Sequence, residues 1–279
     1  MNRRPVCLTN DFTQVNNHII DSFTSVKGPG DFPVSSRKKL IKGIIAPNLD
    51  YKYSKYGMAW SYKEIAEAEL PDVYVIVGSG IKEFNTYSFA DWETALGIVK
   101  INKDFGNELV RKSSILKNNA EQYVENTSIE LQLPYLQYVN KDFLNKVSFV
   151  PVLVGNESYD ELLKLADLLS DINGKVCYIF SANLVYHGKE FNYVPYIYAV
   201  KENLTLVNEQ LIDAICSLDS KKFYDLSRRK NVLDRNVVVV AIEIMRGLGL
   251  KKGRFLNYYE SGEFCDYENS VGFCSIVFD

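Results

Sequence analysis

Short apolar runs alternate with helical patterns along this chain of 279 residues, and this alternation constrains its fold most. Residues 40–46, 73–77, 147–154 and 176–180 are short, largely apolar runs that end at turn residues, which is typical of buried strands. Helical patterns lie between or after them, over residues 58–69, 105–116, 161–169 and 199–218 and near Lys221. We therefore predict an α/β fold, a single domain over residues 1–279, with a mostly parallel central sheet and helices on both faces.

Two segments differ in how clearly their pattern reads. Residues 161–169 carry an apolar stripe at helical spacing, and Ser158 with Glu161 forms a capping-box pattern before it. Residues 237–246 contain four consecutive valines, so this segment reads either as a buried helix or as a strand–helix junction. We expect closing strands over residues 255–259 and 271–278.

Charge and cysteine content exclude several classes of protein. The 32 Lys and Arg residues nearly balance the 35 Asp and Glu residues, and no basic cluster is longer than Arg228-Arg229-Lys230, so we expect no nucleic-acid partner. No apolar run approaches the length of a membrane span, and the basic residues at the N-terminus are not followed by an apolar run of signal-peptide length, so we expect neither a membrane span nor a signal peptide. An odd number of cysteines without a C-x-x-C pair favours free thiols in the cytoplasm: Cys7, Cys177, Cys216, Cys265 and Cys274.

Motifs that would indicate a nucleotide site or a catalytic nucleophile are weak here. Gly78-Ser79-Gly80 follows a strong strand but lacks the third glycine of a dinucleotide fingerprint, so a tight turn at the strand end is favoured. His18 lies in a polar segment, where a surface position is expected. His187 follows the 176–180 strand, near the sheet edge at which ligands collect, although one histidine alone is more often structural.

Several segments, taken in order, carry a family resemblance. They are Arg3-Arg4-Pro5-Val6, Pro47-Asn48-Leu49-Asp50-Tyr51-Lys52-Tyr53-Ser54, Trp92-Glu93-Thr94-Ala95-Leu96-Gly97, Asn126-Thr127-Ser128-Ile129-Glu130-Leu131-Gln132-Leu133-Pro134, Val150-Pro151-Val152-Leu153-Val154-Gly155, and Ser261-Gly262-Glu263 with Ser270-Val271-Gly272-Phe273. Their order and spacing resemble the Memo family, which includes the protein-B component of the AmmeMemoRadiSam system. The resemblance implies a fold similar to that of class III extradiol dioxygenases.

The same resemblance implies a metal site, but its histidines are replaced in this chain. Relatives place histidines where this sequence has Asn48, Ile81, Thr127 and Tyr186. The family's aspartate reads Asn183, and its His-Tyr pair is reversed as Tyr186-His187. Some relatives carry a cysteine ligand where register places Phe264, one residue from Cys265. Because an isoleucine offers no lone pair and neutral amide or hydroxyl oxygens bind transition metals weakly, we expect no metal and no cofactor.

Three hypotheses follow from this substitution pattern. The first is a non-catalytic protein of this family that binds a protein or a small molecule, or serves in assembly. The second is an Fe- or Cu-dependent oxidoreductase whose ligands have moved to Asp50, His187, Glu263 and Cys265. The third is a metal-free hydrolase or transferase that uses Asp50, Glu130 or Glu263 as acid and base.

We favour the first hypothesis, with no catalytic residue and a pocket built from the family-equivalent positions. These are Asn48, Asp50, Ile81, Thr127, Asn183, Tyr186, His187, Glu263 and Cys265. If the equivalence holds, Asn48, Asn183 and Tyr186 lie together and hydrogen-bond each other in place of a metal. The resemblance also implies a setting with a radical-enzyme partner, and the sequence leaves open whether this chain still works with one. It also leaves open whether the chain forms a homo-oligomer.

Overall fold

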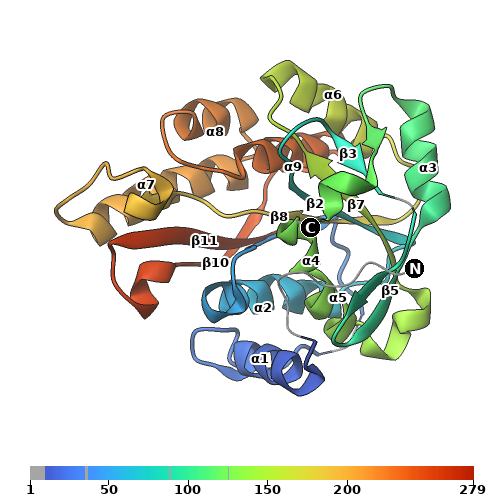
Figure 1. Cartoon of the computed structure of the whole chain (residues 1–279), viewed down its shortest axis with the longest axis horizontal. Helices are drawn as coiled ribbons and strands as arrows, with labels where there is room; N and C mark the ends of the chain where they lie inside the picture. The colour runs from blue at the N-terminus through green and yellow to red at the C-terminus, as the bar shows by residue number, and fades with distance from the viewer. Residues whose placement is uncertain (1–9, 35–36, 88, 125) are drawn as a thin grey trace.

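A computed structural model of the chain describes residues 10–34, 37–87, 89–124 and 126–279, and its strands join into one sheet (Figure 1). Within these residues the sheet order is β10-β11-β1-β8-β2-β7-β3-β6. β4 and β5 form a hairpin that joins β7, and β9 pairs with β11. The strands are β1 (Gly43–Ala46), β2 (Val73–Ser79), β3 (Asn85–Thr86), β4 (Trp92–Thr94), β5 (Gly97–Ile101), β6 (Lys117–Asn118), β7 (Ser148–Val154), β8 (Val176–Ser181), β9 (Tyr186–Gly188), β10 (Arg254–Glu260) and β11 (Asn269–Phe278).

The centre of the sheet is parallel and its flanks are antiparallel. β1, β8, β2 and β7 run in the same direction, while β11 is antiparallel to β1 and β3 is antiparallel to β7. Neighbouring parallel strands bring their carboxyl ends to one edge of the sheet. The segments that follow β1, β2 and β8 therefore meet at that edge.

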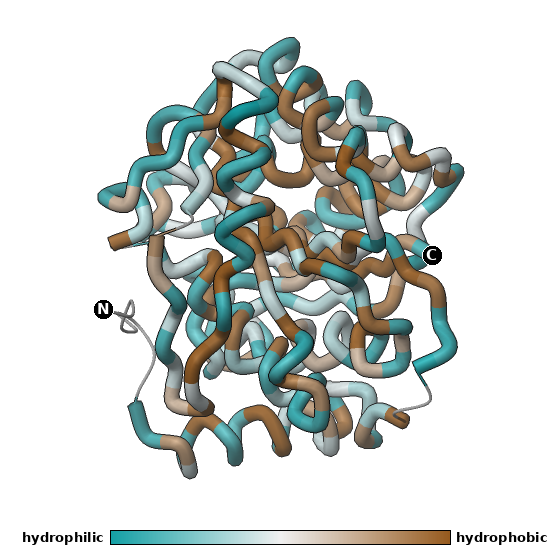
Figure 2. The backbone as a smooth tube through the Cα atoms, turned by 90° about the vertical axis from the view of Figure 1, so that its right-hand side faces the viewer, coloured by the Kyte–Doolittle hydropathy of each residue, from teal (hydrophilic) through white to brown (hydrophobic). Residues whose placement is uncertain are grey.

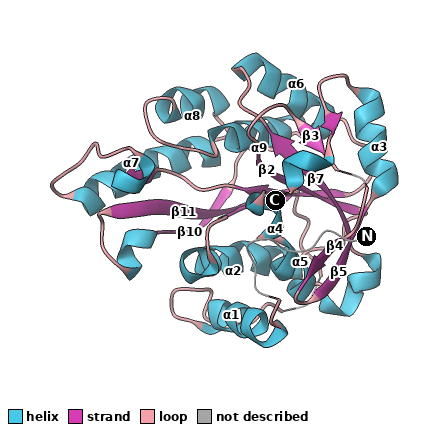
Figure 3. Ribbon diagram, viewed as in Figure 1, coloured by secondary structure: helices cyan, strands magenta, loops and turns pink. Residues whose placement is uncertain are grey.

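Helices cover both faces of the sheet, as predicted (Figure 3). One face packs against α1 (Phe12–Thr24), α2 (Tyr51–Glu67), α4 (Thr127–Glu130) and α5 (Leu133–Val139). The other packs against α3 (Lys103–Lys112), α6 (Tyr159–Ser170), α7 (Val200–Cys216), α8 (Ser220–Ser227) and α9 (Arg235–Gly247). Short 3-10 turns lie at Ala120–Tyr123, Lys141–Lys146, Lys189–Phe191 and Ser261–Phe264.

The core has two layers, one on each side of the sheet. In β2, Val75 and Val77 belong to the layer under α6 and α9, whereas Tyr74 and Ile76 belong to the layer under α2 and α5. Because both faces of a central strand are buried, its sequence is apolar throughout instead of alternating. Hydrophobic stretches accordingly run through the middle of the molecule in Figure 2.

Most predicted elements are confirmed, with shifted ends. α6 begins where Ser158 Oγ accepts a hydrogen bond from the Glu161 backbone N–H. α2 begins at Tyr51, earlier than predicted, because the Asp50 side chain caps it by accepting from the Lys52 backbone N–H. β1 begins at Gly43, later than predicted, and Leu40 before it is 71% exposed.

Two segments resolve questions that the sequence left open or missed. The four valines lie in α9, a helix whose residues Val237 to Ile242 are all buried, so burial overrides the strand preference of valine. The polar segment with His18 is α1, which the sequence analysis did not predict; His18 is half-buried there. Its buried face, with Val15, Ile19 and Phe23, has the helical spacing that identifies it.

Two further observations concern the described part of the chain alone. None of its helices is long and apolar enough to cross a membrane. Its cysteines Cys177, Cys216, Cys265 and Cys274 are free thiols. The predicted Arg3-Arg4-Pro5-Val6 segment and Cys7 lie outside the described residues.

Candidate functional site

Polar side chains gather at the carboxyl edge of the sheet, where β1, β2 and β8 end. Asn48 follows β1, Ser79 ends β2, Asn183 follows β8, and Tyr186 begins β9. Asp234 joins them from the position just before α9. We call these five residues the Asp234 cluster.

Two asparagines hold the cluster together across neighbouring strands. The Asn48 backbone N–H donates to Asn183 Oδ1 at 3.0 Å, and Asn183 Nδ2 donates to Asn48 Oδ1 at 2.6 Å. Asn183 Nδ2 also donates to the Tyr186 hydroxyl oxygen at 2.7 Å. The structure thus brings together three of the predicted site residues, which hydrogen bonds link through Asn183.

The Asp234 carboxylate is the acceptor at the centre of the cluster. Ser79 Oγ donates to its Oδ1 at 2.5 Å, and the Asn183 backbone N–H donates to its Oδ2 at 2.8 Å. Longer contacts to Oδ2 come from Asn48 Nδ2 at 3.4 Å and the Tyr186 hydroxyl at 3.5 Å. Donors from three strand ends and from β9 therefore converge on one carboxylate.

Burial dominates the electrostatics of the cluster. Desolvation raises the pKa of Asp234, and the hydrogen bonds from Ser79, Asn183 and Asn48 oppose that rise. Desolvation also raises the pKa of Tyr186 well above its ordinary value, and the neighbouring Asp234 carboxylate adds to the effect. Tyr186 therefore keeps its proton and acts as a hydroxyl, not as a phenolate.

A second layer of hydrogen bonds supports the cluster. Gln132 Nε2 donates to the Pro47 carbonyl and to Ser181 Oγ, both at 2.9 Å. Ser181 Oγ in turn donates to the Ser128 carbonyl at 2.6 Å, and Asn126 Nδ2 donates to the Ser79 carbonyl at 2.8 Å. Two of the segments that carry the family resemblance, residues 47–54 and 126–134, are thus linked by the buried Gln132.

The remaining predicted positions on this side do not join the cluster. Asp50 is exposed and caps α2. Ile81 is 88% exposed, and Thr127 is half-buried at the start of α4. Glu130, an alternative acid or base, is buried in α4, whereas Asp50 and Glu263 are exposed. The three carboxylates therefore do not share one buried site.

His187, Glu263 and Cys265 serve other contacts. His187 is buried, its Nε2 lies 3.2 Å from the Tyr196 carbonyl oxygen, and its ring stacks on Tyr196. It pairs with Ser270 in β11, and it points away from Tyr186 as successive residues of a strand do. Glu263 is exposed and forms an ion pair with Lys27 at 3.4 Å, while exposed Cys265 Sγ contacts the Ser261 carbonyl.

The donors of the Asp234 cluster do not fit a divalent iron, copper or zinc ion. Such ions prefer imidazole, thiolate and carboxylate donors, and the cluster offers one carboxylate, two amides and two hydroxyls. The carboxylate oxygens already accept hydrogen bonds, and Tyr186 is protonated. Throughout the described ranges, no group of three or more His, Cys, Asp or Glu side chains is arranged to hold a metal ion.

A cavity of about 560 Å³ opens at the same edge of the sheet. Its walls come from the turn after β2 and from the segment before α4: Ile81, Lys82, Glu83, Asn119, Glu121, Gln122, Val124 and Asn126. Two apolar side chains, Ile81 and Val124, are largely exposed at 88% and 60%. Asn126 connects this cavity to the Asp234 cluster through its bond to the Ser79 carbonyl.

Sequence reasoning missed Asp234 and assigned Ser79 only to a turn. An aspartate just before a helix normally caps it, which makes Asp234 unremarkable in sequence. In the structure its side chain makes no capping bond and turns into the cluster instead. No local pattern signals this, because its partners lie 48 or more residues away.

Comparisons with known proteins find a matching family model and similar sequences. A family model described as Memo-like protein matches residues 10–277. A MEMO1 family protein of Methanopyrus kandleri is 29% identical over 260 residues, covering 90% of this chain and 88% of that protein. One of Thermoplasma acidophilum is 28% identical over 244 residues, covering 85% of each.

A solved structure gives a likeness at the level of fold. It is that of an uncharacterized protein from Escherichia coli K12, with a TM-score of 0.50 and 10% sequence identity. The match covers 86% of this chain and 100% of that one.

Proposed function

This chain belongs to the Memo family, and we propose that it is a non-catalytic member without a metal centre, which binds a small ligand at the carboxyl edge of its sheet. The proposal places the ligand in the cavity beside the Asp234 cluster. The cluster itself serves as a rigid wall that holds the ends of β1, β2 and β8 in place.

One observation supports the proposed absence of a metal centre. The Asp234 carboxylate, the only charged group of the cluster, already accepts hydrogen bonds on both oxygens, from Ser79 and from the Asn183 backbone N–H. A metal ion would have to displace these donors and leave them without their acceptor, at a cost of up to about 1–3 kcal/mol each. Hydrogen bonds between protein groups thus take the place of metal–ligand bonds.

The cavity supports binding of a small and largely uncharged ligand. Its volume lies within the ordinary range for small-molecule sites, roughly 300–1,000 Å³. The amide side chains of Asn119, Gln122 and Asn126 supply donors and acceptors, and the walls also hold one cation, Lys82, and two anions, Glu83 and Glu121. Ile81 and Val124 add apolar contacts at the walls.

We also propose that the protein works in the cytoplasm. The free thiols of the described cysteines suit a reducing compartment, where disulfides rarely persist.

Metal retention tests the central part of the proposal. The full chain is incubated anaerobically with Fe(II), Cu(I) or Zn(II) and desalted, and bound metal is measured by mass spectrometry. We expect far less than one equivalent per chain, and the same low amount in a His187→Ala, Cys265→Ala double variant. About one equivalent that is lost in the double variant would instead overturn the proposal, indicate a relocated ligand set and make an oxidoreductase the working hypothesis.

The ligand-binding part is tested separately, by ligand-observed NMR with a panel of uncharged primary amides and diols. We expect saturable binding that weakens in Asn126→Leu, which removes a polar group from the cavity, and persists in Asn107→Leu, an exposed control on α3. Equal binding to both variants, or none to the wild type, would refute a ligand site in this cavity.

A further inference from the structure

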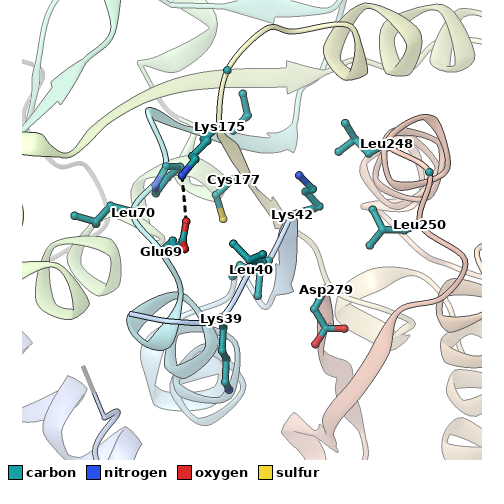
Figure 4. Close-up of a pocket in the computed structure, with 15 residues that line it drawn as sticks. Lys39, Leu40, Lys42, Glu69, Leu70, Lys175, Cys177, Leu248, Leu250 and Asp279 are labelled. Carbon is teal, nitrogen blue, oxygen red and sulfur yellow. Dashed lines mark hydrogen bonds and ion pairs between the residues drawn. The ribbon is translucent and has the colours of Figure 1, made fainter. Parts of the chain in front are cut away.

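A second cavity lies at the opposite, amino-terminal edge of the sheet. It has a volume of about 500 Å³ and shares no residue with the Asp234 cluster or with the cavity beside it. Segments from five elements form it: those preceding β1, β2 and β8, the turn after α9, and the residue after β11 (Figure 4). This cavity is independent of the proposed function.

Most of the cavity wall is apolar. Leu40, Leu70, Val176, Leu248 and Leu250 line it together with the Cys177 thiol. Leu40 is 71% exposed, although the neighbouring strand β1 is entirely buried. A large apolar side chain that is exposed within a hollow gains free energy when an apolar group covers it, about 25 cal/mol per Å² buried.

The charged side chains of the cavity are paired, with one exception. Lys39 Nζ contacts Glu64 at 2.7 Å and Glu67 at 2.8 Å, Lys175 Nζ contacts Glu69 at 3.1 Å, and Asp279 contacts Arg254 at 2.9 Å. Within the described part of the chain, the Lys42 ammonium forms neither an ion pair nor a side-chain hydrogen bond. The exposed Lys42 ammonium is therefore available to an anion that enters the cavity.

Lys42 is solvent-exposed and lies at the wall of this cavity, next to its apolar lining. Figure 4 draws its side chain between Cys177 on one side and Leu248 and Leu250 on the other, whereas Lys39 points away from them. The electrostatics agree: burial raises the pKa of the Cys177 thiol to about 12, and the nearby Lys42 ammonium opposes that rise. The unpaired charge and the apolar wall thus belong to the same space.

We propose that this cavity binds a small amphipathic carboxylate, with the carboxylate on the Lys42 ammonium and the apolar chain against Leu40, Leu248 and Leu250. An ammonium–carboxylate bond of this kind is stronger than a bond between neutral groups. The apolar wall excludes short hydrophilic anions as good ligands, because they leave Leu40 uncovered.

Calorimetric titration of the full chain with octanoate tests this site. We expect saturable binding that weakens as salt rises, since the ion pair is partly screened. Octylammonium, with the opposite charge, should not bind. Butyrate and octanol, which lack most of the chain or the charge, should bind at least several-fold more weakly.

Matched variants locate the site. Lys42→Met keeps the apolar stem of the side chain and removes its charge, and we expect roughly a tenfold or greater loss of octanoate affinity. Lys38→Met is the control, because Lys38 is exposed, lies nearby and does not line the cavity. Leu40→Ser, at an exposed position that the fold tolerates, should also weaken octanoate but not change the salt dependence.

Several outcomes would overturn the proposal. The first is the absence of saturable octanoate binding below about 1 mM, a range in which weak specific ligands already bind. The second is equal affinity of octanoate for Lys42→Met and for the wild type. The third is binding of octylammonium as tight as that of octanoate. If octyl phosphate binds and octanoate does not, the anion is a phosphate and the carboxylate assignment is wrong. If only a peptide that ends in leucine binds, the cavity receives a protein partner and not a small molecule.

Discussion

Asp234 shows how one side chain sets the character of the candidate site. Its partners Ser79, Asn183 and Asn48 come from three strand ends, and each presents a donor to the same carboxylate. An amide at this position would place an N–H group against donors that need an acceptor. The requirement for a carboxylate therefore comes from its surroundings.

We predict that Asp234→Asn destabilises the protein by about 1–3 kcal/mol, the cost of leaving buried donors unsatisfied. The loss should depend on pH, because burial raises the pKa of Asp234 above its ordinary value of 3.8 in the folded state. Between these two values the folded wild type holds a proton that the unfolded chain has released, so its stability falls as pH rises.

The variant lacks this titration, so the stability difference between wild type and variant should be largest below about pH 4. It should shrink as pH rises and become constant above the raised pKa. Urea unfolding of both proteins at matched pH values measures the difference and cancels the other titrating groups. A difference that grows with pH would contradict the assigned pKa shift.

At the scale of elements, the Trp92-Glu93-Thr94-Ala95-Leu96-Gly97 segment has a structural explanation. It forms the β4–β5 hairpin, with Trp92 fully buried and Thr94 Oγ1 donating to Gln137 Oε1 at 2.6 Å. Gly97 has a φ of +113°, a conformation that side chains disfavour. The resemblance in this segment therefore reflects a hairpin and its anchor, away from the Asp234 cluster.

Gly97→Ala should destabilise the protein by about 1–3 kcal/mol. The cost is conformational, since an added Cβ would meet only Gln137 Nε2, at 3.9 Å. Ala95→Gly, at a half-buried position in the same turn, is a control for general loosening of the hairpin. Thermal unfolding of both variants separates the effects, and a neutral Gly97→Ala would show that the turn adopts another conformation.

The close approach of β2 and α4 is a second feature of this scale. A Cβ on Gly78 would lie 2.2 Å from Ser128 Oγ, so only glycine lets this strand end meet the helix. The Gly78-Ser79-Gly80 turn, which the sequence could place only at a strand end, thus brings Ser79 within reach of Asp234.

At the scale of the whole molecule, the fold determines which thiols react. Burial raises the pKa of Cys177 to about 12 and of Cys216 to about 11, and it also raises the pKa of Cys274. Cys265, by contrast, is exposed. Because the thiolate is the reactive form, burial lowers both the access to a thiol and its reactive fraction.

We predict that a brief iodoacetamide pulse at pH 8 modifies Cys265 much faster than Cys177, Cys216 or Cys274. Peptide mass spectrometry distinguishes the sites, and Cys265→Ser should leave the other three as slow as in the wild type. In urea, all of them should react at similar rates. Fast modification of Cys177 in the folded protein would show that reagents reach this thiol through the second cavity, at the amino-terminal edge of the sheet.

The sequence by itself determined the class of fold and the family. Continuous apolar runs and helical stripes report local preferences and burial, and these place β2, β7, β8 and α6 close to their observed bounds. Even the four valines of α9, ambiguous in local propensity, carried the correct information that the segment is buried. Asn48, Asn183 and Tyr186 could be grouped in advance because the family resemblance supplied their register.

Only the tertiary structure decided which polar groups meet. Asp234 reaches Ser79 across 155 positions of the chain, and no local pattern encodes so distant a contact. The same holds for Lys42, which five separate segments of the chain place beside the apolar wall of one cavity. Local sequence specifies the elements through short-range sterics and burial, whereas the chemistry of a site depends on long-range contacts that form only when the sheet is assembled.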